Sequence, residues 1–329
     1  MEMTWEQWKA MKKDLRRRFS GTGWTLLIYY IILNASVLLW VFFETIWNML
    51  TVMPFGEAGD LEQIASAASE SGWGYFLAAA FGLLILLLWK KPRYFRDEIF
   101  AKGKPMGVGT FFGILCIFLG GQFLSQMMIS VTEMIMNLFG FSMLEGMEAL
   151  AVDFDNFSMF LYAGVLAPVT EELLFRGLVQ RTLMPFGKRF AIFCSAFTFG
   201  LYHGNLIQTP FAFLVGLILG YVAAEYNIFW AMLLHMINNL VVADMLYRML
   251  SFLPEMTSGV VIWLILLAFA VAGLVILIVK RDKTREWRTS EPIYRTYLGC
   301  FFSSAGMIVF NVVIGLMMIY TFTVLVSPL

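Results

Sequence analysis

The chain alternates between long apolar runs and short polar connections. About nine of the runs are near the length of roughly 20 residues that an α-helix needs to cross the hydrocarbon core of a bilayer. They lie near 24–48, 72–89, 107–130, 157–183, 190–208, 211–226, 228–250, 259–279 and 297–326. These runs lack the two-residue alternation of barrel strands, and backbone groups in lipid must be paired within the protein. The pattern therefore predicts an all-α polytopic membrane protein, a bundle of about nine transmembrane helices.

The polar connections differ in charge and predict the orientation. Basic residues gather in 9–18, 90–104, 181–189 and 280–295, and acidic residues in 57–70 and 145–155. Alternating spans place all four basic connections on one side of the membrane. The positive-inside rule then predicts a cytoplasmic N-terminus and an external C-terminus. Residues 131–152 are apolar but are broken by Gly140 and acids, so we expect an interfacial helix there on the outer face.

Composition agrees with an integral membrane protein surrounded by lipid. The 329 residues are 60% hydrophobic and 14% charged, whereas a soluble domain is about 25% charged. The formal net charge is zero, which gives no indication of a nucleic-acid partner. Cys116, Cys194 and Cys300 lie in or beside separate apolar runs without a CxxC spacing. We therefore expect packed core cysteines rather than a disulfide framework or a zinc knuckle.

Ionisable and amide side chains inside the predicted spans are the strongest functional signal. Such groups are costly in lipid and usually serve a function. The fourth span carries Glu171, Glu172 and Arg176, the fifth carries His203, and the seventh carries His235, Asn238 and Asn239. The chain has only these two histidines.

Helical spacing separates the roles of the two glutamates. Glu172 and Arg176 are four residues apart, share a face and can form an ion pair. Glu171 lies about 100° further around the helix and has no charged partner within it. Pro168 cannot donate to the Gly164 carbonyl, so the helix is expected to loosen there. A loosened helix is tolerated where it lines a cavity, although an ordinary proline kink is the alternative.

The remaining polar residues can be interpreted together or separately. His235 and Asn239 share a helix face, and His203 also needs a partner. A single buried histidine is usually a packing residue, and Asn238 is expected to join two helices. The simplest common arrangement is one water-filled pocket that gathers Glu171, His203, His235 and Asn239.

The same residues resemble the motifs of a known family. The segments Glu171-Glu172-x-x-x-Arg176, Phe199-x-x-x-His203 and His235-x-x-x-Asn239 are similar to the three motifs of the CPBP family. That family contains the CAAX prenyl proteases of the Rce1 type and bacterial bacteriocin-processing or self-immunity proteins. The resemblance covers about 157–250, which we interpret as the catalytic core. Helices of 1–156 precede this core, and helices of 251–329 follow it.

The resemblance implies a glutamate protease of the membrane that acts without a covalent intermediate. Its substrate would be a membrane-associated or lipidated peptide or protein. When the roles of the family's motif residues are transferred to the matching positions, the resemblance implies that Glu171 is the general base and His203 its partner. It also implies that His235 and Asn239 stabilise the oxyanion. The supporting residues are Glu172, Arg176 and Phe199.

Several alternatives stay open at the level of sequence. No cofactor is implied, but two histidines and a glutamate are also a possible zinc ligand set, even though HExxH is absent. A non-catalytic immunity or scaffold protein of the same fold is the second hypothesis. A proton-coupled transporter is the third, and the lack of an inverted repeat argues against it. The short connections favour a protein of the bacterial plasma membrane.

Overall fold

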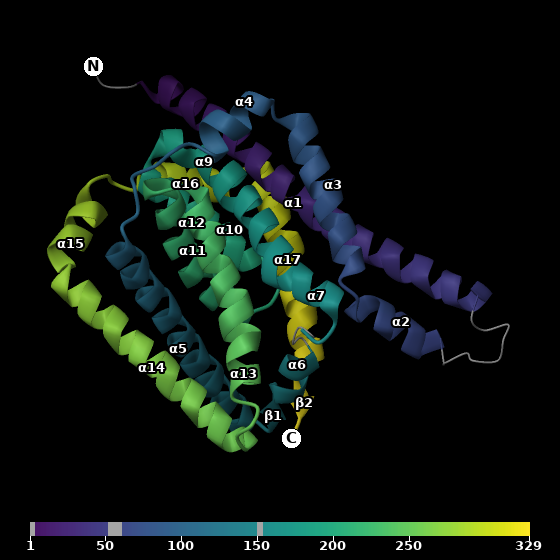
Figure 1. Cartoon of the computed structure of the whole chain (residues 1–329). Coiled ribbons are helices and arrows are strands. Elements are labelled where there is room, and N and C mark those ends of the chain that lie inside the picture. Colours follow the sequence, from purple (N-terminus) through teal and green to yellow (C-terminus); the bar gives the residue numbers. More distant parts are fainter. Residues whose placement is uncertain (1–3, 52–60, 150–153) are drawn as a thin grey trace.

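The computed structural model describes residues 4–51, 61–149 and 154–329, which form an almost entirely helical bundle (Figure 1). The α-helices are α1 (Trp5–Thr51), α2 (Leu61–Glu70), α3 (Trp73–Trp89), α4 (Pro92–Tyr94), α5 (Val108–Leu138), α6 (Leu144–Ala149), α7 (Phe157–Leu161), α8 (Ala167–Glu172), α9 (Arg181–Leu183), α10 (Lys188–Tyr202), α11 (Gln208–Glu225), α12 (Ile228–Ile237), α13 (Leu246–Met249), α14 (Glu255–Val279), α15 (Arg281–Thr289), α16 (Arg295–Phe302) and α17 (Ala305–Leu325). π-Helical segments are η2 (Phe95–Ile99), η3 (Tyr162–Leu166), η4 (Leu173–Gln180) and η6 (Asn238–Met245), and η5 (Met184–Phe186) is a 3₁₀ turn. The two short strands are β1 (Phe141–Ser142) and β2 (Ser327–Pro328).

Seven helical stretches of the described residues are long and apolar enough to cross a membrane. They are α1, α5, 157–186, α11, 228–249, α14 and α17. An eighth is counted if 64–70 and 73–88, which are bent by 47° at a short break, form one span. The all-α polytopic membrane fold predicted from the sequence is confirmed, with seven or eight such helices in place of about nine.

The predicted fifth span is a short helix that ends in a tight turn. α10 has 15 residues and ends at Tyr202, which is short of the roughly 20 that a full crossing needs. Gly204 then has a φ of +61°, which glycine adopts readily. Asn205 Oδ1 accepts a hydrogen bond from the Ile207 N–H at 2.8 Å and closes the turn. α11 packs back against α10, so the two helices form a hairpin whose turn carries His203.

Small residues bring the long helices close together, as is common in membrane bundles. A Cβ on Gly23 of α1 would lie 2.2 Å from the backbone carbon of Gly306, at the start of α17. A Cβ on Gly120 of α5 would lie 2.8 Å from the Cα of Ala270 in α14. Larger side chains at these glycines would force the helices apart.

The expected interfacial helix at 131–152 is wrong for most of its length. Residues 131–138 continue α5, and the chain then turns at Gly140, whose φ is +81°. β1 pairs antiparallel with β2, a contact between residues distant in sequence. Glu133 is buried there and accepts hydrogen bonds from Ser142 Oγ at 2.7 Å and the Met143 N–H at 2.9 Å. Part of the acidic connections, 57–60 and 150–153, lies outside the described residues.

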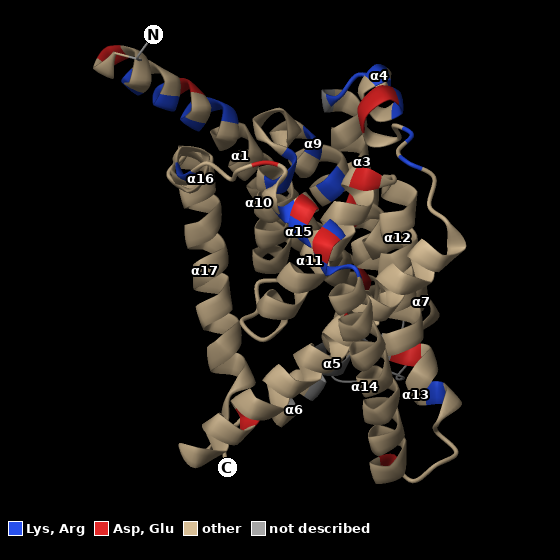
Figure 2. Ribbon diagram, turned by 90° about the vertical axis from the view of Figure 1, so that its left-hand side faces the viewer, with Lys and Arg blue, Asp and Glu red and all other residues tan. Residues whose placement is uncertain are grey.

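Charged residues are distributed unequally between the two ends of the bundle. Lys and Arg gather where α1 begins and around α4, α9 and α15 (Figure 2). The start of α1 and the end of α17 lie at opposite ends of the bundle (Figure 1). This distribution agrees with the alternation of basic and acidic connections in the sequence. The cytoplasmic location of the basic end remains a prediction of the positive-inside rule.

A buried glutamate connects three of the segments at the basic end. Glu225 is the last residue of α11, and its side chain is 7% exposed. Its carboxylate binds Lys104 Nζ and Lys188 Nζ, each at 2.7 Å, and accepts a hydrogen bond from Trp287 Nε1 at 3.3 Å. The hydrogen bond to Glu225 raises the pKa of Lys104. The 102–107 connection, the start of α10 and α15 are thereby held against one end of α11.

The orientation predicts a sided labelling pattern. Ser290 follows α15 and Ser251 precedes α14, so the membrane span α14 separates these two exposed serines. In a cysteine-free background, Ser290→Cys should react with an impermeant thiol reagent only in inside-out vesicles. Ser251→Cys is the matched control and should react only in right-side-out vesicles. The reverse pattern would contradict the predicted orientation.

Candidate active site

The membrane span that carries the two glutamates is an irregular helix. π-Helical segments η3 and η4 flank α8, which contains both Glu171 and Glu172. π-Helical turns occur frequently at functional sites. Pro168 lies in the first turn of α8, and the backbone widens directly before it. The expected loosening of the helix before the glutamates is therefore present.

A second irregular segment lies against the first. η6 contains Asn239 and Leu240, and Leu240 packs on Gly164 of η3. A Cβ on Gly164 would lie 2.2 Å from Leu240 Cδ2. This close approach brings the two polar segments of the sequence, 171–176 and 235–239, to the same place in the bundle.

Glu172 and Arg176 form the ion pair predicted from their spacing. Arg176 Nη1 lies 3.0 Å from Glu172 Oε1, and both side chains are 0% exposed. Arg176 Nη2 also donates to the Gly216 carbonyl at 3.2 Å. The guanidinium stacks over the ring of Phe199, 4.4 Å from its centroid. The pair therefore joins α8 and η4 to α10 and α11.

His235 connects the two glutamates. Its Nδ1 donates a hydrogen bond to Glu172 Oε1 at 3.0 Å, because a carboxylate oxygen can only accept. Its Nε2 lies 3.7 Å from Glu171 Oε2. The resemblance implied His203 as the partner of Glu171. In the described residues, the imidazole within ion-pair distance of Glu171 is that of His235.

His203 is located on the turn after α10 and is exposed. Its Nδ1 lies 2.9 Å from the Phe199 carbonyl oxygen. Since that oxygen only accepts, Nδ1 carries the proton and Nε2 of the neutral ring keeps its lone pair. The ring of Phe199 lies 4.9 Å from that of His203 and 5.7 Å from that of His235, edge to face with each. Both histidines are therefore packed against one aromatic ring.

A chain of amides holds Asn239. Asn239 Nδ2 donates to the Ala163 carbonyl at 2.8 Å, and Asn238 Nδ2 donates to Asn239 Oδ1 at 3.1 Å. Gln122 of α5 donates to Asn238 Oδ1. Asn238 thus joins two helices, as expected, and one N–H of Asn239 remains for another acceptor. Gln122 was not predicted from the sequence, although an amide within an apolar run was a signal for it.

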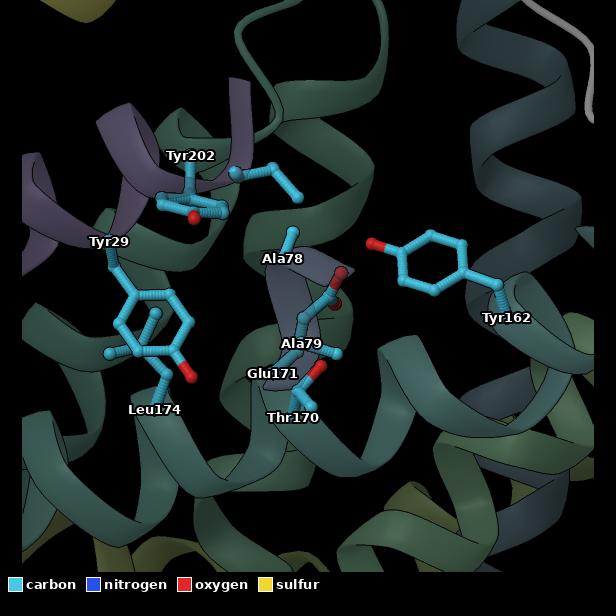
Figure 3. A pocket seen from close by; sticks show the side chains of 9 residues that line it. Tyr29, Ala78, Ala79, Tyr162, Thr170, Glu171, Leu174 and Tyr202 are labelled. Atoms are coloured by element: carbon cyan, nitrogen blue, oxygen red, sulfur yellow. The ribbon is translucent and has the colours of Figure 1, made fainter. Parts of the chain in front are cut away.

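Glu171 also lines a cavity (Figure 3). The cavity is lined by Tyr29 and Leu33 of α1, Ala78 and Ala79 of α3, and Tyr162, Thr170, Glu171, Leu174 and Tyr202. The Glu171 side chain is 25% exposed. His203, His235 and Asn239 are not among the residues that line this cavity, and a single pocket shared by all four residues stays a prediction. Glu171 therefore both lines the cavity and lies within ion-pair distance of His235.

The contributions of α1 and α3 to this cavity were not predicted from the sequence. Tyrosines near membrane interfaces are common, so Tyr29 had no distinctive sequence signal. Among the described residues, no group of three or more His, Cys, Asp or Glu side chains is placed to hold a metal ion. The three cysteines are free, and Cys194 and Cys300 are buried.

Residues 153–241 match the Rce1-like family model, described as type II CAAX prenyl endopeptidase Rce1-like. The match supports the resemblance to this family that the three motifs indicated. The match includes all the residues of the three motifs and leaves out α1, α3 and α5. No curated protein and no solved structure matches the chain. Because the Rce1-like family is one of endopeptidases, the match indicates a peptidase in an integral membrane protein.

Proposed function

We propose that the chain is an intramembrane endopeptidase that hydrolyses a peptide bond with water activated by Glu171. The position of Glu171 carries the proposal. The carboxylate of the neighbouring Glu172 is already paired with Arg176 and His235. Glu171 has His235 as its only ion-pair partner among the described residues, and it faces a cavity. An acid that is accessible and not neutralised by a basic side chain is suited to act as a general base.

The charge balance of the buried cluster supports a proton-transfer role. Two carboxylates and one guanidinium leave a formal charge of −1 while the His235 imidazole is neutral. Net charge in a low-dielectric interior is unfavourable. A proton that Glu171 takes from water brings the formal charge of the cluster to zero. Glu171 is therefore placed to take up and release a single proton.

In the proposed reaction, the other polar side chains of the site assist the attack of water on the peptide bond. Glu171 removes a proton from water while the water oxygen bonds to the scissile carbonyl carbon. His203 Nε2 accepts a hydrogen bond from the same water, and the remaining N–H of Asn239 donates to the developing oxyanion. His235 holds Glu171 and supports the oxyanion when protonated. The carbon–nitrogen bond then breaks, and the proton passes from Glu171 to the leaving amine.

A peptide library tests this function. We expect a membrane-associated or lipidated peptide or protein as the substrate, such as a bacteriocin leader or another membrane protein, in a bacterial plasma membrane. The purified protein in lipid nanodiscs is incubated with prenylated, acylated and unmodified peptides, and the products are identified by mass spectrometry. The proposal requires cleavage at a defined bond. A well-folded protein that cleaves no member of the library would contradict it.

Metal removal is expected to leave the hydrolysis rate unchanged. The proposed reaction uses a carboxylate and no metal-bound water. EDTA and 1,10-phenanthroline should each change the rate by less than about twofold, since they remove no group that this mechanism requires. Loss of activity that added zinc restores would replace the proposed mechanism with a metal-dependent one.

A further inference from the structure

Helices outside the family-matched segment form one wall of the Glu171 cavity. α1 contributes Tyr29 and Leu33, which are four residues apart and share a face, and α3 contributes Ala78 and Ala79. The two helices pack against each other. The family match begins at residue 153, so it assigns no role to this wall.

Tyr29 is the polar side chain of this wall. It is 9% exposed, and its hydroxyl has no hydrogen-bond partner among the described residues. Its ring rests on Gly82 of α3, where a Cβ would lie 2.4 Å from the tyrosine Cζ. Figure 3 shows Tyr29 and Tyr162 on opposite sides of Glu171, with the Tyr29 ring extending into the cavity. Burying a hydroxyl without a partner is unfavourable, so this position favours a ligand that supplies an acceptor.

We propose that the wall formed by α1 and α3 is a substrate subsite and that Tyr29 is its hydrogen-bond donor. The acceptor is a backbone carbonyl of the substrate beside the scissile bond. A peptide must be extended to be cleaved, and its carbonyls then lose their helical partners in a water-poor site. Ala78 and Ala79 line the cavity beside Tyr29 with small side chains. This inference rests on the proposed peptidase function.

Tyr29→Phe removes the hydroxyl and keeps the ring on Gly82. Because the hydroxyl has no hydrogen-bond partner among the described residues, its loss should not lower Tm. We expect kcat/KM to fall by about three- to tenfold, the usual effect of one lost neutral hydrogen bond. The change should appear mainly in KM, because the contact is made with the bound substrate before reaction. Tyr30→Phe is the matched control, since Tyr30 is the next residue of α1 and is not among the cavity-lining residues.

A series of substrates locates the contacted carbonyl. One peptide bond at a time on either side of the scissile bond is replaced by a thioamide, which is a weaker acceptor. One of these substitutions should weaken cleavage by the wild type and have no further effect on Tyr29→Phe. Such non-additivity is the signature of a direct contact.

The outcomes separate this inference from the proposed function. If the wild type cleaves peptides and Tyr29→Phe has unchanged kinetics on all of them, the subsite is wrong and the peptidase stands. A variant with lower Tm and unchanged KM would make Tyr29 structural and overturn the subsite. Absence of cleavage by a well-folded wild type would overturn both.

Discussion

Glu171→Gln is expected to lower kcat for peptide hydrolysis by about 10²–10⁴-fold, the usual contribution of a general base. The amide keeps the shape of the side chain but cannot take a proton from water. Since Glu171 is partly exposed and pairs with no Lys or Arg in the described residues, its loss of charge should leave Tm nearly unchanged. Initial rates on a cleaved peptide and thermal unfolding of the same preparation measure the two effects.

Glu172→Gln is the matched comparison, one residue further along the same helix. It removes a charge that is 0% exposed and paired with Arg176, so it should lower both Tm and activity. The contrast between adjacent glutamates distinguishes a catalytic from a structural carboxylate. Activity of Glu171→Gln within tenfold of the wild type would exclude Glu171 as the base.

Arg176→Ala is expected to lower the free energy of unfolding by about 3–5 kcal/mol, because it leaves the buried Glu172 carboxylate without its cation. The guanidinium also binds the Gly216 carbonyl and stacks on Phe199. Removing it therefore loosens the contacts of α10 and α11 with the glutamate helix. Thermal unfolding and the yield of folded protein in detergent measure the change.

Two further variants distinguish a structural role of the Glu172–Arg176 ion pair from a catalytic role. Arg248→Ala is the control, because Arg248 pairs with Asp155 and Asp244 but is half exposed, and exposed pairs contribute little. The double variant Glu172→Met with Arg176→Met should recover much of the stability, since no charge is left unpaired. It should stay inactive because His235 loses its Nδ1 acceptor. If Arg176→Ala keeps the wild-type Tm and loses only turnover, Arg176 belongs to the catalytic set.

The all-α membrane fold and the pairing of residues within one helix could be predicted from the sequence. Each apolar run has the length of a membrane span, which predicts the all-α membrane fold. The ion pair of Glu172 and Arg176 follows from helical geometry, because residues four apart share a face. The cost of polar groups in lipid singled out Glu171, His203, His235 and Asn239. All these inferences depend on local spacing and composition.

Only the tertiary structure decided how separate helices meet. Spacing within a helix does not give the rotation of one helix about its axis relative to another, so His235 rather than His203 lies beside Glu171. The hairpin turn at Gly204 shortened the predicted fifth span because one glycine with positive φ ends α10. The wall formed by α1 and α3 depends on close packing at Gly82, which brings Tyr29 to a glutamate more than a hundred residues away in the chain. Contacts of this kind depend on the shapes of facing helix surfaces, which the hydrophobic pattern of a single chain does not contain.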